Sequence, residues 1–116
     1  MFFISVIVSL IMTKVKITVI QVQNPKEIWG EKTPIEVSKS FGPCERHYEG
    51  QEFIVEESFK MPEDFCHWSW AGIHQAVRML LFGGDYPWSI EKGSAVVCCN
   101  DGLRPVIYKL ERIVEE

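Results

Sequence analysis

Residues 69–84 read SWAGIHQAVRMLLFGG, and this stretch decides the fold class of the chain. Ser69 is typical of a helix N-cap, because its side-chain oxygen can accept a hydrogen bond from a free backbone amide of the first turn. Apolar residues then recur at the spacing of one helix face, at Trp70, Ile73, Val77 and Leu80. Gly83 and Gly84 follow, and glycine tolerates the left-handed conformation common just beyond a helix. The stretch predicts one amphipathic helix that packs against another element.

Strand patterns lie on both sides of this helix. Residues rich in β-branched side chains and bounded by turn signals occur in four segments, 15–23, 51–57, 94–99 and 105–113. The last two are joined by a short glycine-containing turn, which predicts a hairpin. Residues 26–43 predict a long loop with a short strand at 35–37. The order predicts an α+β domain, in which a small, mainly antiparallel sheet of about four strands, open or barrel-like, packs against one amphipathic helix.

Length and composition indicate one ordinary globular domain. The chain has 116 residues, of which 47% are hydrophobic and 24% charged, and these values leave no room for a second domain or a long disordered tract. The formal net charge is -4, and the basic residues are scattered along the chain. Nucleic-acid binding normally needs a clustered positive surface, so this class of function is excluded.

The first eleven residues, MFFISVIVSLI, are apolar and contain no Lys or Arg. A spanning helix needs about 20 apolar residues, and a secretory signal needs a basic start and a small-residue cleavage site. We therefore expect residues 1–11 to be an upstream-start extension and residues 12–116 to form the domain. An additional strand, or a weak membrane or partner contact, remains an alternative. No stable membrane insertion is expected, and the predicted location is the cytoplasm, where stable disulfides are rare.

The cysteines suggest a metal or cofactor site. Cys44 lies near His47, Cys66 begins the helix region, and Cys98 adjoins Cys99. Thiolates and imidazoles are the ligands that zinc prefers, and iron-sulfur clusters are held mainly by thiolates. Neighbouring residues on a strand point to opposite faces, so only one residue of the Cys98–Cys99 pair would face such a site unless the strand bulges or ends there. The alternative is that the cysteines pack as small hydrophobic residues.

Cys66 is also a weak candidate for a catalytic or redox thiol. A helix N-terminus favours the reactive thiolate, and His67 or His47 could serve as its base. Burial among Phe65, Trp68 and Trp70 would oppose this, because it disfavours the thiolate.

Aromatic residues gather near the predicted helix ends and loops. Trp29, Trp68 and Trp88 are candidates for the lining of a ligand pocket or partner surface, and Arg104 could bind a carboxylate there. The alternative for each aromatic ring is a place in the core, and Arg104 could instead pair with Asp101 across a turn.

Several segments together carry a resemblance, namely MTKVKITVI, EGQEFIV, FCHWSWAGI, LLFGGDYPW and VVCCNDGLRPVIYKLERI. Across residues 12–113 the chain resembles a family of short uncharacterised bacterial and archaeal proteins. The resemblance implies a prokaryotic origin and supports Met12 as the start of the domain. It brings no known substrate, cofactor or catalytic residue.

The sequence thus leaves three functions open. The first is a small non-enzymatic domain that binds zinc, an iron-sulfur cluster or a small cofactor through Cys44, His47, Cys66 and either Cys98 or Cys99. The second is an interaction or accessory module with structural cysteines and an aromatic-lined pocket for a protein partner or small molecule. The third is a thiol enzyme or redox protein centred on Cys66.

Overall fold

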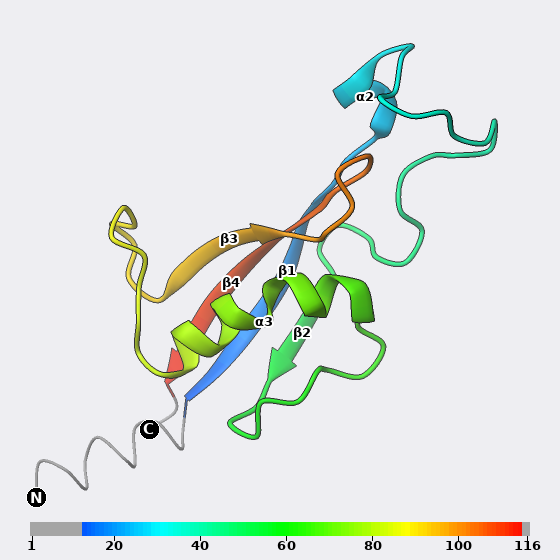
Figure 1. Ribbon diagram of the computed structural model, residues 1–116. Coiled ribbons are helices and arrows are strands. Elements are labelled where there is room, and N and C mark those ends of the chain that lie inside the picture. Colours follow the sequence, from blue (N-terminus) through cyan, green and yellow to red (C-terminus); the bar gives the residue numbers. More distant parts are fainter. Residues whose placement is uncertain (1–12, 115–116) are drawn as a thin grey trace, which may run out of the picture.

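The computed structural model describes residues 13–114, which form one antiparallel sheet with a helix on one face (Figure 1). The elements in chain order are β1 Thr13–Val22, α2 Pro25–Trp29, β2 Glu52–Val55, α3 His67–Leu81, β3 Ser94–Cys98 and β4 Val106–Val114. The sheet order is β2-β1-β4-β3, and each neighbouring pair is antiparallel. The predicted α+β class and antiparallel sheet are confirmed, and the sheet is open rather than closed into a barrel. The predicted extension at residues 1–11 lies outside the described residues.

Alternation along the central strands builds the core. Ile17 of β1 lies opposite Phe53 of β2 and Leu110 of β4, and all three point toward α3. The predicted stripe on α3 meets them there, because side chains three or four residues apart share a helix face. The buried apolar residues are Val15, Ile17, Val19, Phe53, Val55, Phe65, Ile73, Ala76, Val77, Leu80, Leu81, Ala95, Val106, Tyr108 and Leu110.

The opposite face of the sheet carries ion pairs. Lys16 Nζ lies 3.5 Å from Glu52 Oε2 and 3.8 Å from Glu111 Oε1, so it bridges β2 and β4 across β1. Lys109 Nζ lies 3.9 Å from Glu111 Oε2 on the same face. Such exposed pairs contribute only about 0–1 kcal/mol each, and they keep this face polar.

Helix α3 begins earlier than predicted. Its first residue is His67 and its N-cap is Cys66, so the prediction of Ser69 as the N-cap was wrong. Ser69 instead lies buried in the first turn, where its Oγ accepts a hydrogen bond of 2.7 Å from the Tyr108 hydroxyl. The C-terminal prediction is confirmed, because Gly83 N–H donates to Leu80 O at 3.0 Å and Gly84 N–H to Met79 O at 2.8 Å.

The predicted long loop contains a short helix and no strand at residues 35–37. Asn24 caps α2 by accepting from Lys26 N–H at 3.0 Å, and Pro25 occupies the first helical position, where its missing N–H costs nothing. Arg104 fastens the loop that follows, because its Nη1 donates to Gly42 O at 3.0 Å and its guanidinium lies 4.4 Å from the centre of the Phe41 ring. Within residues 13–114, no helix has the length and apolar character needed to cross a membrane.

Candidate functional site

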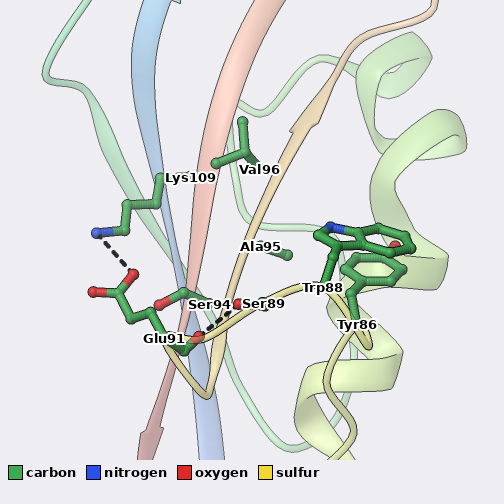
Figure 2. A pocket seen from close by; sticks show the side chains of 8 residues that line it. All are labelled: Tyr86, Trp88, Ser89, Glu91, Ser94, Ala95, Val96 and Lys109. Carbon is green, nitrogen blue, oxygen red and sulfur yellow. Dashed lines mark hydrogen bonds and ion pairs between the residues drawn. The ribbon is translucent and has the colours of Figure 1, made fainter.

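A pocket of about 390 Å³ lies beside β3, with lining residues from the preceding loop, from β3 and from β4 (Figure 2). The loop between α3 and β3, which ends where β3 begins, contributes to its lining. Four lining residues come from this loop, and the other four come from β3 and β4. The lining residues are Tyr86, Trp88, Ser89, Glu91, Ser94, Ala95, Val96 and Lys109.

The two aromatic rings of the loop stack on each other in this pocket. The Tyr86 and Trp88 ring centroids are 4.7 Å apart and their planes are inclined by only 8°, so the rings are stacked. Tyr86 packs against the core, whereas Trp88 is 76% exposed. One face of the indole therefore rests on Tyr86. Figure 2 shows the two rings on the α3 side of β3.

The opposite side of the pocket is polar. Lys109 Nζ lies 3.7 Å from Glu91 Oε2, and Ser89 Oγ donates to Glu91 O at 2.8 Å. Glu91 and Lys109 lie across the strand from the stacked rings in Figure 2. A ligand at this edge would meet an aromatic surface on one side and an ion pair on the other.

Arg112 anchors the loop that carries the pocket. Its Nη1 donates to Leu80 O at 3.2 Å and to Gly84 O at 2.8 Å, and its Nη2 lies 3.3 Å from Asp85 Oδ2. Asp85 Oδ1 also accepts the Gly93 N–H. That hydrogen bond and the adjacent Arg112 guanidinium hold the pKa of Asp85 below its usual value, although partial desolvation opposes them. Both ends of the loop are thus tied to Arg112 of β4, at Gly84 and Asp85 and again at Gly93.

Trp29 and Trp68 lie in a different depression, also of about 390 Å³. Trp29 Nε1 donates to Leu103 O at 3.2 Å, and the Asn100 amide donates to Trp68 O at 3.0 Å. The predicted aromatic candidates therefore divide between two surfaces, with Trp88 alone at β3. Arg104 fastens the long loop, and its Nε also donates to Asp101 Oδ2 at 3.3 Å, so two of its three nitrogens have protein partners.

Three of the four cysteines, Cys44, Cys66 and Cys99, lie near the buried Tyr108. Cys98, the last residue of β3, is exposed, whereas Cys99 lies just beyond the strand, packs against the core and accepts the Val106 N–H at 3.3 Å. Burial raises the pKa of Tyr108, the hydrogen bond with Ser69 opposes this, and Cys99, Cys66 and Cys44 add to the increase. Among residues 13–114, no three His, Cys, Asp or Glu side chains are placed to hold a metal ion. The predicted zinc or iron-sulfur site stays a prediction.

His47 is a structural residue in this arrangement. Its Nδ1 lies 2.9 Å from Gln51 Oε1, and its Nε2 accepts the Cys66 N–H at 3.3 Å. These partners require a neutral ring with the proton on Nδ1, and they leave no free nitrogen for a metal or for the Cys66 thiol. Both ring nitrogens are already hydrogen-bonded, so His47 has no nitrogen left for the predicted roles of metal ligand or of base for Cys66.

The neutral state of His47 makes stability depend on pH. Burial lowers its pKa below the usual 6.5, the Gln51 hydrogen bond opposes this, and the charge of Arg46 adds to the lowering. Below that usual pKa the unfolded chain binds the proton more readily than the folded chain. The free energy of unfolding should therefore fall as pH drops below 6.5, by at most about 1.4 kcal/mol per pH unit.

Urea unfolding from pH 8 down to the onset of acid unfolding would measure this slope. His47→Gln should remove it, while the exposed His67→Gln variant should keep it. An identical slope in the His47→Gln variant would assign the dependence to another group.

Sequence reasoning missed most of the β3 pocket. Glu91 and Lys109 carry no local signal, because only the sheet register brings β4 beside the loop. The pair of aromatic residues after Gly83 and Gly84 was the available clue. No protein-family model, curated protein or solved structure matches this chain, so the resemblance to short bacterial and archaeal proteins stays a prediction.

Proposed function

We propose that this protein is a non-enzymatic binding module whose ligand lies in the β3 pocket against Trp88. The observation that carries the proposal is the stacked Tyr86–Trp88 pair. A large, exposed aromatic ring that already stacks on a neighbouring ring offers contact area beside a pocket at little cost in side-chain entropy. Trp and Tyr are also the residues that most often dominate binding energy in protein interfaces.

The anchored loop supports the same proposal. Arg112 and Asp85 hold the loop between α3 and β3 before any ligand arrives. Binding to such a preorganised surface avoids the entropic cost of ordering a loop. Ile90, which is 96% exposed on the same loop, does not line the pocket and is not included in the proposed contact surface.

The chemistry of the lining favours binding over catalysis. Its charged side chains, Glu91 and Lys109, form an ion pair on the outside of the sheet. Catalytic acids and bases usually lie in clefts where burial and neighbouring charges tune them. The pocket therefore suits a partner protein or a small molecule with an apolar group better than it suits a substrate whose reaction needs an acid or a base.

Nuclear magnetic resonance of the full chain would test this proposal. The probes are a fragment library that includes capped single amino acids, and the readout is the indole N–H signals of the four tryptophans. We expect bound fragments to shift the Trp88 signal and the Ala95 amide, with Trp29 and Trp68 as internal controls. Trp88→Ala should weaken binding at least about tenfold.

Trp29→Ala is the matched control, since it removes the same side chain from the other depression. Fragments that shift Trp29 and Trp68 instead of Trp88, or that bind Trp88→Ala unchanged, would contradict the proposal. Absence of any binding fragment or peptide would contradict it as well.

A further inference from the structure

We propose that the ligand of the β3 pocket is an extended polypeptide segment that adds a strand to the sheet along β3. This inference rests on the proposed function and names the partner class of the same site. It follows from the backbone of β3, from the side chains of the two edge strands, and from the position of the pocket.

The backbone of β3 offers a row of free hydrogen-bonding groups. Arg112 N–H donates to Gly93 O at 2.7 Å and Cys99 N–H donates to Val106 O at 3.0 Å, which fixes the ladder with β4 at both ends. Hydrogen-bonded and non-hydrogen-bonded residues alternate in an antiparallel pair. Ser94, Val96 and Cys98 therefore direct their N–H and C=O groups away from β4. Within residues 13–114 no other strand pairs with this edge.

The two edges of the sheet differ in how they are protected. Edge strand β2 carries Glu52, which pairs with Lys16, and is followed directly by Glu56. Charged side chains of this kind discourage a further strand from pairing. Edge strand β3 reads SAVVC and contains no charge, no proline and two β-branched residues. Such a strand is a template for strand addition, and its exposure points to a partner that covers it.

The surroundings of β3 define what the added strand should carry. On one face its side chains would approach Tyr86 and Trp88, and on the other they would lie beside Val96, which is 63% exposed. The pocket volume of about 390 Å³ is near the lower end for ligand sites, so one or two side chains would fill it. The partner segment is thus extended, with a large apolar or aromatic residue facing Trp88 and a β-branched residue facing Val96.

Substitutions at Val96 separate backbone pairing from side-chain contact. Val96→Pro removes an outward N–H and leaves the ladder with β4 intact, because proline is tolerated on an edge strand when its nitrogen faces solvent. Val96→Thr is the matched control, since it keeps both the N–H and the branched shape. The probe is a random ten-residue peptide library displayed on phage, from which binders are selected on the full chain and then synthesised.

We expect selected peptides to alternate apolar and polar residues. Val96→Pro should weaken their binding about tenfold or more, and Val96→Thr should change it by less than about threefold. Methylation of the peptide nitrogens should weaken binding only at alternate positions, because only those N–H groups face β3. Hydrogen exchange at the Val96 and Cys98 amides should slow in the complex. The methylation and exchange results stand even if Val96→Pro fails to fold.

The outcomes distinguish this inference from the proposed function. If Trp88→Ala abolishes peptide binding while Val96→Pro and every methylated peptide bind normally, the pocket function stands and strand addition is overturned. The same conclusion follows if fragments bind at Trp88 and no peptide is selected. If neither Trp88→Ala nor Val96→Pro weakens binding, both proposals fail.

Discussion

Phe65→Ala is expected to lower the free energy of unfolding by about 3–5 kcal/mol, which is a large part of the stability of a domain of this size. Phe65 is fully buried and lies just before α3. Its ring centroid is 5.0 Å from that of Phe53, 5.1 Å from that of His47 and 5.4 Å from that of Tyr108. Truncation would leave a cavity at the point where the helix entrance, β2 and β4 meet.

Urea unfolding at pH 7.5 would measure the effect. Phe82→Ala is the matched control, because Phe82 follows α3 directly and is exposed, and it should lower stability by less than about 1 kcal/mol. The two variants remove the same atoms, so the difference reports burial. A loss below about 1 kcal/mol for Phe65→Ala would mean that this aromatic cluster does not hold the domain together.

Local patterns predicted most of the fold. Alternation in β1, the apolar stripe of α3 and the stop at Gly83 and Gly84 all depend on residues close in sequence, and all were confirmed. The position of the α3 N-cap at Cys66 did not follow from local pattern. The Cys66 N–H donates to the imidazole of His47, which lies 19 residues earlier in the chain. Helix α2 shows the opposite case. Its start signal, Asn24 followed by Pro25, is local, but the same two residues are also typical of a turn that simply ends a strand.

The candidate site was less predictable than the fold. Trp88 was a candidate from sequence, but nothing local separates it from Trp29 and Trp68, which lie elsewhere. That β3 is an edge strand depends on the pairing of β1 with β4, two strands from opposite ends of the domain. Long-range pairing of this kind has no signature in a single sequence, so neither the exposed backbone of β3 nor its pocket could be anticipated.

Arg112→Met should lower the free energy of unfolding by about 2–4 kcal/mol and weaken ligand binding at Trp88 as well. The guanidinium of Arg112 is largely buried, with 16% of the side chain exposed. It supplies hydrogen bonds to two carbonyls at the end of α3 and an ion pair to Asp85. Methionine fills similar space but leaves these acceptors without a donor, which costs more than a lost surface contact.

The binding effect follows from the same contacts. Asp85 lies next to Tyr86, so loss of its Arg112 contact should free the segment that carries the stacked rings. Arg78→Met is the matched control, since Arg78 is exposed on α3 and only approaches Phe59 and Phe82, and it should cost less than about 1 kcal/mol. Denaturation and peptide titration of both variants provide the measurements. If Arg112→Met unfolds like the parent protein, or binds the selected peptide with unchanged affinity while folded, then the loop is held by other contacts and Trp88 does not depend on this anchor.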